Sequence, residues 1–255
     1  MPAPARKGVP ALLGAGTLCA ALLLSGCATP EPAAPPAPAR PPASATAPAG
    51  RATDARPEAA ARVPGLGPLT RARVPDGTDQ VLVVTGTTEN SNTATAVLHQ
   101  RTKGRWTTAG GPWTVHNALR GWTADHSAGD LRTPIGVYRI GDAGGRLPNP
   151  GSRLPYDEDP QFAISGTGFE GEPLEGSFDH VIAIDYNRVP GRTPLDKERP
   201  LGAGKGGGVW IHVDHGGPTQ ACVALHREDL RALLVLLDPA ADPVIAMGPA
   251  PDLAR

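Results

Sequence analysis

Residues 209–225 read VWIHVDHGGPTQACVAL, and this stretch reveals more about the chain than any other. An apolar run at 209–213, with His212 inside it, has the composition of a buried β-strand. A Gly-Gly-Pro loop follows, and Cys222 opens a second apolar run ten residues after the histidine. A loop of this length can bring the second run back beside the first, at the strand spacing of about 4.8 Å. The sequence therefore predicts an imidazole and a thiol close together.

Such a pair has a recognised chemical use. A free thiol has a pKa of about 8.5, so only a few per cent of it is thiolate at pH 7. An imidazole that accepts the thiol proton turns the sulfur into a strong nucleophile. The backbone N–H groups of Ala221 and Cys222 are candidates for holding an oxyanion in the same pocket. We therefore expect Cys222 to act as a nucleophile and His212 as its base.

The surrounding sequence predicts a mainly-β domain of the sandwich or barrel type. Gly, Pro, Asn and Asp clusters separate short apolar runs at 81–85, 95–99, 113–116, 136–140, 180–186, 209–213 and 244–247. One amphipathic helix follows the cysteine, because leucines recur at i, i+3, i+4 and i+7 from Leu230 to Leu237 before Pro239 ends the pattern.

The first residues have the pattern of an export signal. Arg6 and Lys7 precede an apolar stretch at 9–24, which is shorter than the roughly 20 residues of a membrane span. The run ends in Leu-Ser-Gly-Cys27, which resembles the lipobox of bacterial lipoproteins. We expect residues 1–26 to be a lipoprotein signal peptide. Cys27 would then carry the lipid that anchors the exported protein at the outer face of the cytoplasmic membrane, in the cell-wall zone.

The next segment differs sharply from the rest of the chain. Residues 28–64 contain 10 Pro and 14 Ala and no aromatic residue, so they cannot bury enough surface to offset the entropy of ordering. We expect a disordered tether at 27–65, a globular domain at 66–249 and a short tail at 250–255. With Cys19 removed with the signal and Cys27 lipidated, Cys222 is the remaining thiol and has no partner for a disulfide.

Charge and composition exclude some functions. The 24 basic and 25 acidic residues give a formal net charge of −1, so no basic excess indicates a nucleic-acid partner. We find no internal repeat, and we expect a monomer without nucleic-acid partners.

Three segments together resemble the L,D-transpeptidases with the YkuD-type fold. The family's His, loop and Ser/Thr-x-Gly-Cys signature is matched by His212 and TQACV at 219–223. Its Gly-Trp and Gly-Asp-x-x-Thr-Pro-x-Gly segment is similar to residues 121–136, and Asp-Tyr-Asn at 185–187 is a common element before the signature. Residues 238–243 with the strand after them also resemble actinobacterial members.

The resemblance implies a mixed β-sandwich that needs no cofactor and acts on peptidoglycan stem peptides. Cys222 would attack the carbonyl between stem residues three and four, D-alanine would leave, and the acyl group would pass to an amine of a second stem. His212 matches the family's base, oriented by the backbone carbonyl of Val213. Thr219 and Gln220 match substrate contacts, and we place Trp210 near the cleft with them. Water in place of the amine would give a carboxypeptidase.

This sequence departs from the family pattern at three positions: Gln220 replaces a common histidine, Ala221 replaces glycine, and Ala224 replaces a common arginine. If position 221 requires a positive φ, alanine costs about 1–2 kcal/mol there. Replacing Ala221 with glycine would then speed acylation about tenfold.

Other readings of the same residues remain open. A zinc-dependent murein peptidase would use a ligand set drawn from His212, His215, Cys222 and His226. His126 and Asp130 are a further, weak similarity to zinc murein peptidases. A sortase-like transpeptidase and a non-catalytic wall-binding lipoprotein are further alternatives. The simplest interpretation of the remaining motif residues is structural: Asp130 and Thr133 shape a turn, Trp122 lies in the core or near the cleft, and three histidines lie on strands or the surface (His116, His126 and His180).

Overall fold

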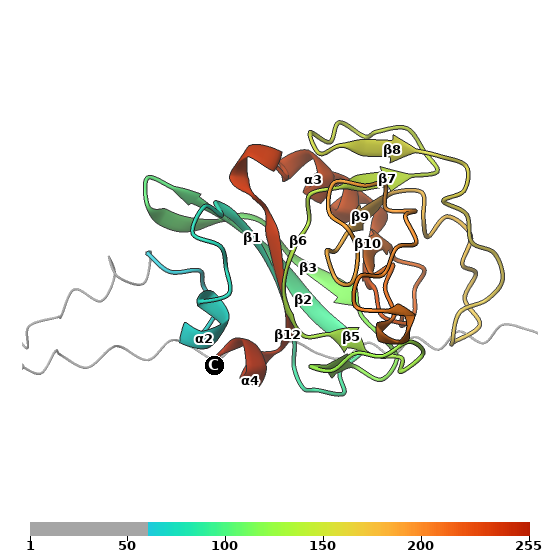
Figure 1. Cartoon of the computed structure of the whole chain (residues 1–255), viewed down its shortest axis with the longest axis horizontal. Coiled ribbons are helices and arrows are strands. Elements are labelled where there is room, and N and C mark those ends of the chain that lie inside the picture. The colour runs from blue at the N-terminus through green and yellow to red at the C-terminus, as the bar shows by residue number, and fades with distance from the viewer. Residues whose placement is uncertain (1–60) are drawn as a thin grey trace, which may run out of the picture. The chain divides into compact units, whose positions relative to one another are not determined.

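The computed structural model describes residues 61–255, and β-strands form most of their regular structure (Figure 1). The strands are β1 (Gln80–Gly86), β2 (Thr93–Thr102), β3 (Arg105–His116), β4 (Trp122–Thr123), β5 (Thr133–Pro134), β6 (Gly136–Arg139), β7 (Ala143–Gly145), β8 (Tyr156–Glu158), β9 (Val181–Ala183), β10 (Trp210–Val213), β11 (Val223–Leu225) and β12 (Val244–Pro249). The helices are α2 (Pro68–Arg71), α3 (Arg227–Leu236) and α4 (Ala250–Leu253), with short 3₁₀ turns η1 (Ala203–Lys205) and η2 (Pro239–Ala241).

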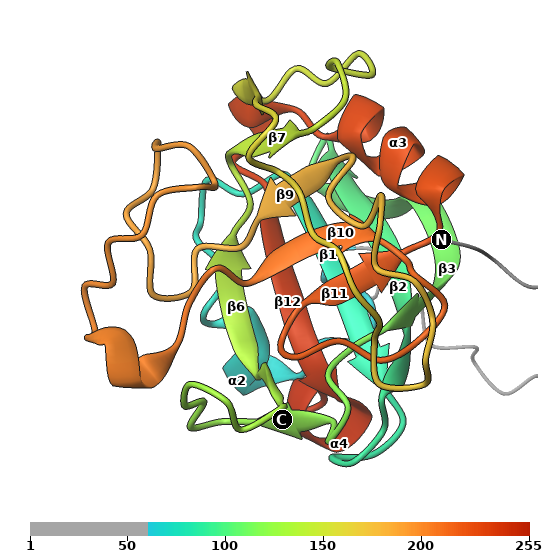
Figure 2. The ribbon, with the colours of Figure 1, turned by 90° about the vertical axis from the view of Figure 1, so that its right-hand side faces the viewer.

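Ten of these strands form one mixed sheet in the order β6-β12-β1-β2-β3-β11-β10-β9-β7-β8, and β4 pairs with β5 separately. Most neighbours are antiparallel, whereas β1–β12, β10–β11 and β7–β8 run parallel. Figure 2 shows the sheet curling, so that β10 crosses in front of β12 and β1. The predicted mainly-β fold with a mixed sheet and one amphipathic helix after the cysteine is confirmed.

Strand β1 lies inside the sheet with both faces covered, and its sequence is accordingly apolar without alternation. Side chains point to opposite faces along a strand. Leu82 and Val84 belong to a large core on one face, and Val81 and Val83 belong to a smaller cluster on the other. Because both faces are covered, the run VLVV is almost fully buried.

The large core fills the space enclosed by the curled sheet. It contains Leu98 of β2 together with Ile182 of β9 and Ile211 of β10, so strands from both halves of the sheet share one apolar interior. Helix α3 adds its leucine face, with Leu230, Leu233 and Leu234 buried. Burying each such leucine stabilises the fold by about 1.5–3 kcal/mol, which holds α3 against the sheet.

The sequence does not predict elements that lack an apolar pattern. Strand β3 begins at Arg105, whereas the apolar run predicts a strand only from residue 113. The first half of β3 is mostly polar, and pairing with β2 holds it in the sheet. The three-residue strands β7 and β8 read AGG and YDE. Residues 250–255, expected as a tail, include α4, and Leu253 of that helix is buried in the smaller cluster.

The signal peptide, the lipidation site Cys27 and most of the tether lie outside the described residues. Near the expected end of the tether, Val63 and Leu66 are only 5% and 4% exposed and pack in the same cluster as Val81. The packed domain therefore includes residue 63, three residues before the predicted boundary. Within residues 61–255, no helix has the length and apolar character that crossing a membrane requires.

Candidate active site

The register of β10 and β11 brings His212 and Cys222 to the same face of the sheet. The two strands are parallel, with Ile211 opposite Val223 and His212 opposite Ala224. Cys222 precedes β11 by one residue and so lies level with Trp210, two positions before His212 on the neighbouring strand. Since side chains alternate between faces, His212 and Cys222 are diagonal neighbours on one face.

Both side chains line a cleft of about 440 Å³. Its other walls come from residues 126–129, the glycine run 206–208, the histidine–cysteine loop (residues 214–221) and a stretch that we call the wall segment (residues 164–174). A cavity of this size fits a short peptide segment better than a large folded partner.

His212 is held in one tautomer. Its Nδ1 atom lies 2.9 Å from the carbonyl oxygen of Val213, which can only accept a hydrogen bond. The proton must therefore sit on Nδ1, and Nε2 keeps its lone pair. The ring is also fixed by edge contact with Phe178 at 5.5 Å and by stacking on His215 at 5.7 Å between centroids. Burial lowers the pKa of His212 to about 4, so the ring is neutral at pH 7.

Cys222 is also neutral at pH 7, because burial raises the pKa of its thiol to about 11. The sulfur accepts a hydrogen bond from the Trp210 N–H at 3.4 Å, which acts in the opposite direction, and the thiol donates to the Gly208 carbonyl at 3.8 Å. In the described part of the chain, no hydrogen bond joins this thiol to His212. The resting pair is thus two uncharged groups in one cleft.

The residues before the cysteine differ in what they can do. Ala221 is not among the described residues with a positive φ. The condition under which alanine would be strained at this position is therefore not met. The hydroxyl of Thr219 donates to the Cys222 carbonyl at 2.7 Å, and its N–H donates to the Asn117 carbonyl at 2.9 Å. Thr219 therefore closes the loop. Gln220 is exposed at the cleft and has its amide free for a ligand.

The side chain of Trp210 lies outside the cleft near which it was expected, whereas Trp122 lies in the core, one of the two places expected for it. Trp210 does not line the cleft. Its ring packs against Phe178 at 5.0 Å and Phe162 at 5.7 Å between centroids. Its contribution to the site is the backbone N–H that contacts the sulfur. Trp122 is fully buried in the large core. The expectation that Trp210 contacts substrate through its side chain is therefore corrected.

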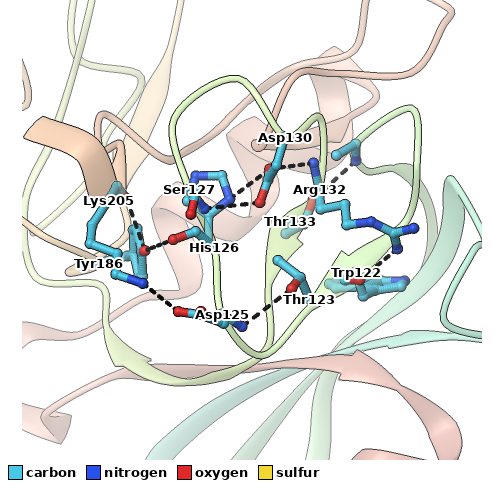
Figure 3. A network of polar contacts seen from close by, with 11 residues as sticks. Trp122, Thr123, Asp125, His126, Ser127, Asp130, Arg132, Thr133, Tyr186 and Lys205 are labelled. Atoms are coloured by element: carbon cyan, nitrogen blue, oxygen red, sulfur yellow. Dashed lines mark hydrogen bonds and ion pairs between the residues drawn. The ribbon is translucent and has the colours of Figure 1, made fainter.

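The segment around Asp130 and Thr133 is a structural turn, as its sequence suggested (Figure 3). The Asp130 carboxylate accepts hydrogen bonds from the N–H groups of Ser127 and Arg132, both at 2.9 Å, and lies 3.0 Å from Nδ1 of His126. The Thr133 hydroxyl accepts from the Ala118 N–H at 3.0 Å. His126 is buried and lines the cleft, so this turn builds one of its walls.

The motif Asp-Tyr-Asn at 185–187 anchors the loop that ends in the glycine run. The Tyr186 hydroxyl donates to the Lys205 carbonyl at 2.9 Å, as Figure 3 also shows. Asn187, at φ 47°, donates to the Gly206 carbonyl at 2.6 Å. These bonds fix residues 206–208, and with them the Gly208 carbonyl that contacts Cys222. No motif in the sequence points to that carbonyl.

The proposed zinc ligands are not brought together. His226 is exposed at the start of α3, whereas His212 and His215 line the cleft. Within residues 61–255 no group of three or more His, Cys, Asp or Glu side chains has the arrangement of a metal site. His116 instead contacts Asp214 at 3.0 Å, and His180 contacts the Tyr156 hydroxyl at 2.8 Å.

A family model identifies the kind of domain. Residues 80–245 match the family YkuD, described as the L,D-transpeptidase catalytic domain. Among solved structures, the helical cell shape determining protein Pgp2 from Campylobacter jejuni is similar at 19% sequence identity and a TM-score of 0.33. That match covers 66% of this chain and 47% of the Pgp2 chain, so this chain spans about half the length of that structure. No curated protein matches the chain.

Proposed function

The chain belongs to the YkuD family of L,D-transpeptidase catalytic domains, and we propose that it transfers peptidoglycan stem peptides through a thioester on Cys222. The supporting observation is that a neutral imidazole with its Nε2 lone pair free and a thiol share one face of a cleft. An imidazole in this tautomer can accept a proton without a side-chain acid behind it, because the Val213 carbonyl already holds Nδ1–H.

The first half-reaction consumes the donor stem. The Cys222 thiol gives its proton to Nε2 of His212 as the sulfur bonds to the carbonyl carbon between stem residues three and four. The resulting imidazolium then gives that proton to the nitrogen of D-alanine as the C–N bond breaks. Since the resting groups are neutral, with pKa values of about 4 and 11, proton transfer accompanies attack rather than preceding it.

The second half-reaction releases the enzyme. A neutral amine of a second stem attacks the thioester carbonyl, one amine proton passes through His212 to the departing sulfur, and an amide forms. If water attacks instead, the same proton path gives a carboxylic acid, which is a carboxypeptidase reaction. Ala221 and Cys222 both line the cleft. Their backbone N–H groups would stabilise the oxyanion in both half-reactions.

A transfer assay tests this proposal. The chain is incubated with a tetrapeptide stem ending in D-alanine and with an excess of a stem bearing a free amine, and products are separated by chromatography. We expect D-alanine and a cross-linked product from the wild type, and neither from Cys222→Ala. A trimmed tripeptide alone would restrict the activity to hydrolysis. If EDTA abolished the reaction and Cys222→Ala kept it, the zinc peptidase alternative would replace the proposal.

We also propose that the protein is exported and lipid-anchored through Cys27, on the evidence of the Leu-Ser-Gly-Cys run alone. This places the cleft in the cell-wall zone, where its substrate is found. Labelling cells with a fatty-acid probe should mark the wild type, whereas Cys27→Ser should carry no label and remain as the longer precursor. Normal labelling of Cys27→Ser would contradict the anchor.

A further inference from the structure

The wall segment is a small hairpin that lines the cleft. Thr167 and Pro173 form a bridge, and the Gly168 N–H donates to the Glu172 carbonyl at 2.8 Å. Its residues Phe169 and Leu174 line the cleft, although the Phe169 side chain is 45% exposed. These bonds shape the hairpin internally, so a separate contact is needed to hold it against the rest of the domain.

Glu172 supplies that contact. Its Oε1 atom lies 3.1 Å from Nδ1 of His215, which belongs to the histidine–cysteine loop. The two side chains are only 11% and 6% exposed, so water screens the pair little. The N–H groups of Glu172 and Glu170 and the charge of His215 lower the pKa of Glu172, so the carboxylate is ionised at neutral pH.

Two glycines make room for this carboxylate. A Cβ atom built at Gly168 of the wall segment would overlap Oε1 of Glu172, and so would a Cβ built at Gly217 of the histidine–cysteine loop. Neither glycine has a positive φ, so their backbones alone would tolerate alanine. The carboxylate thus occupies a slot between the two segments that only residues without a side chain leave open.

The contact continues to the base. The His215 ring stacks on the His212 ring with an interplanar angle of 14° and a centroid distance of 5.7 Å. His212 also meets Phe178 edge-on, at 5.5 Å between centroids. A shift of His215 would therefore remove one of the two ring contacts that hold the His212 ring in place.

We propose that Glu172 is a positioning residue: through His215 it holds the wall segment over Cys222 and fixes the ring of His212. This inference rests on the proposed function, since the closed wall would press the stem peptide against the thiol. Glu172 itself does not line the cleft, so it acts through His215 rather than on the substrate. His215 and Glu172 are 43 residues apart in sequence, and the pair forms only when the wall segment is in place.

The proposal predicts opposite effects on two reactions of the same sulfur. Opening the wall exposes the Cys222 thiol and reduces the burial that raises its pKa, so a small reagent should react faster. A peptide donor needs the wall and the oriented base, so its acylation should become slower. An unfolded fraction would also expose the thiol, so labelling rates are compared only between proteins that are shown to be folded.

The experiment uses two independent variants of the full chain. Glu172→Gln removes the charge at nearly constant size, and Gly217→Ala displaces the carboxylate while leaving every titratable group intact. Gly204→Ala is the matched control, because Gly204 has no positive φ and no atom near a built Cβ. Iodoacetamide labelling of Cys222 is followed by peptide mass spectrometry, and kcat/KM is measured for the tetrapeptide donor.

We expect both variants to be labelled about tenfold faster and acylated about tenfold more slowly, the size expected for losing one buried charged contact, and Gly204→Ala to match the wild type in both. Thermal melting checks that each variant is folded. If labelling is unchanged or slower in both folded variants, Glu172 does not hold the wall and the inference is wrong. A wild type that the donor never acylates would defeat the proposed function instead, while the labelling comparison would still test the wall.

Discussion

The two halves of the curled sheet are built differently. In the half formed by β1, β2, β3 and β12, strands run for 6 to 12 residues and pair along nearly their whole length. In the half formed by β7 to β11, strands have 3 or 4 residues and the chain between them makes long loops. The first half carries most of the regular pairing, and the second half carries the cleft.

The difference shows why the site lies where it does. Short strands end inside the domain, so the next residues leave the ladder and their backbone groups become available. Gly208 and Trp210 contact the Cys222 sulfur through a carbonyl and an N–H at such strand ends. The long strand β3 ends beside the histidine–cysteine loop, where the carbonyl of Asn117 is taken up by the Thr219 N–H and closes that loop. Substitutions in the site half should therefore change chemistry, and substitutions in the other half should change stability.

The largest expected effect separates the two halves most clearly. Cys222→Ala and His212→Gln should each lower the transfer rate by a factor of about 10³ or more, and the double variant should be little worse than either, because residues of one catalytic unit are non-additive. Urea unfolding at pH 7 should detect far smaller losses of stability. Near-normal turnover of a folded His212→Gln protein would show that another group is the base.

Leu98→Ala should have the reverse profile. Leu98 of β2 is fully buried in the large core and does not line the cleft, and its truncation leaves a cavity. The free energy of unfolding should fall by about 2–5 kcal/mol, with kcat/KM of the remaining folded protein within about threefold of wild type. A large loss of kcat/KM without a loss of stability would mean that the two halves are not separable.

The pH dependence of stability should report His212. The unfolded chain takes up a proton on this residue near its ordinary pKa of 6.5, whereas burial delays protonation in the folded state until about pH 4. Stability should therefore fall by up to about 3 kcal/mol as the pH drops from 6.5 to 4. Burial also lowers the pKa of His99 and His180, and these remain in His212→Gln. Unfolding curves of both proteins across this range should differ in slope; equal slopes would refute the burial effect at His212.

Ala221→Gly should have the smallest effect. Because Ala221 does not have a positive φ, glycine relieves no strain, and it adds only backbone freedom. We expect the rate of Cys222 acylation to change by less than about twofold, since any added freedom is offset by loop packing. Stopped-flow acylation of the two proteins would check this, and a tenfold gain would mean that position 221 is strained during catalysis.

Local patterns predicted the apolar elements and the placement of His212 and Cys222 in one cleft. The runs that became β1, β10 and β12 are continuous and buried, and the leucine spacing that became α3 is periodic. His212 and Cys222 were found because they flank one short loop. These features depend on residues close together in sequence, so the sequence alone suffices to find them.

Features built from distant residues could not be predicted. The contact of Glu172 with His215 depends on where the wall segment folds, and no local pattern carries that information. Trp210 is expected near the cleft from the sequence, yet its ring packs against Phe162 and Phe178, which lie 48 and 32 residues before it in the chain. Position 221 looked strained because the family has glycine there, whereas the backbone φ of this chain settles the point.

The most direct test of the proposed thioester mechanism is the identity of the acylated atom. The folded chain is incubated with the tetrapeptide donor and no acceptor, quenched in acid, and mapped by peptide mass spectrometry. The proposed thioester mechanism predicts release of D-alanine and the mass of the tripeptide acyl group on the peptide containing Cys222, with strongly reduced acylation in His212→Gln. A folded wild type that carries no acyl group at Cys222, or D-alanine release that persists in Cys222→Ala, would contradict it.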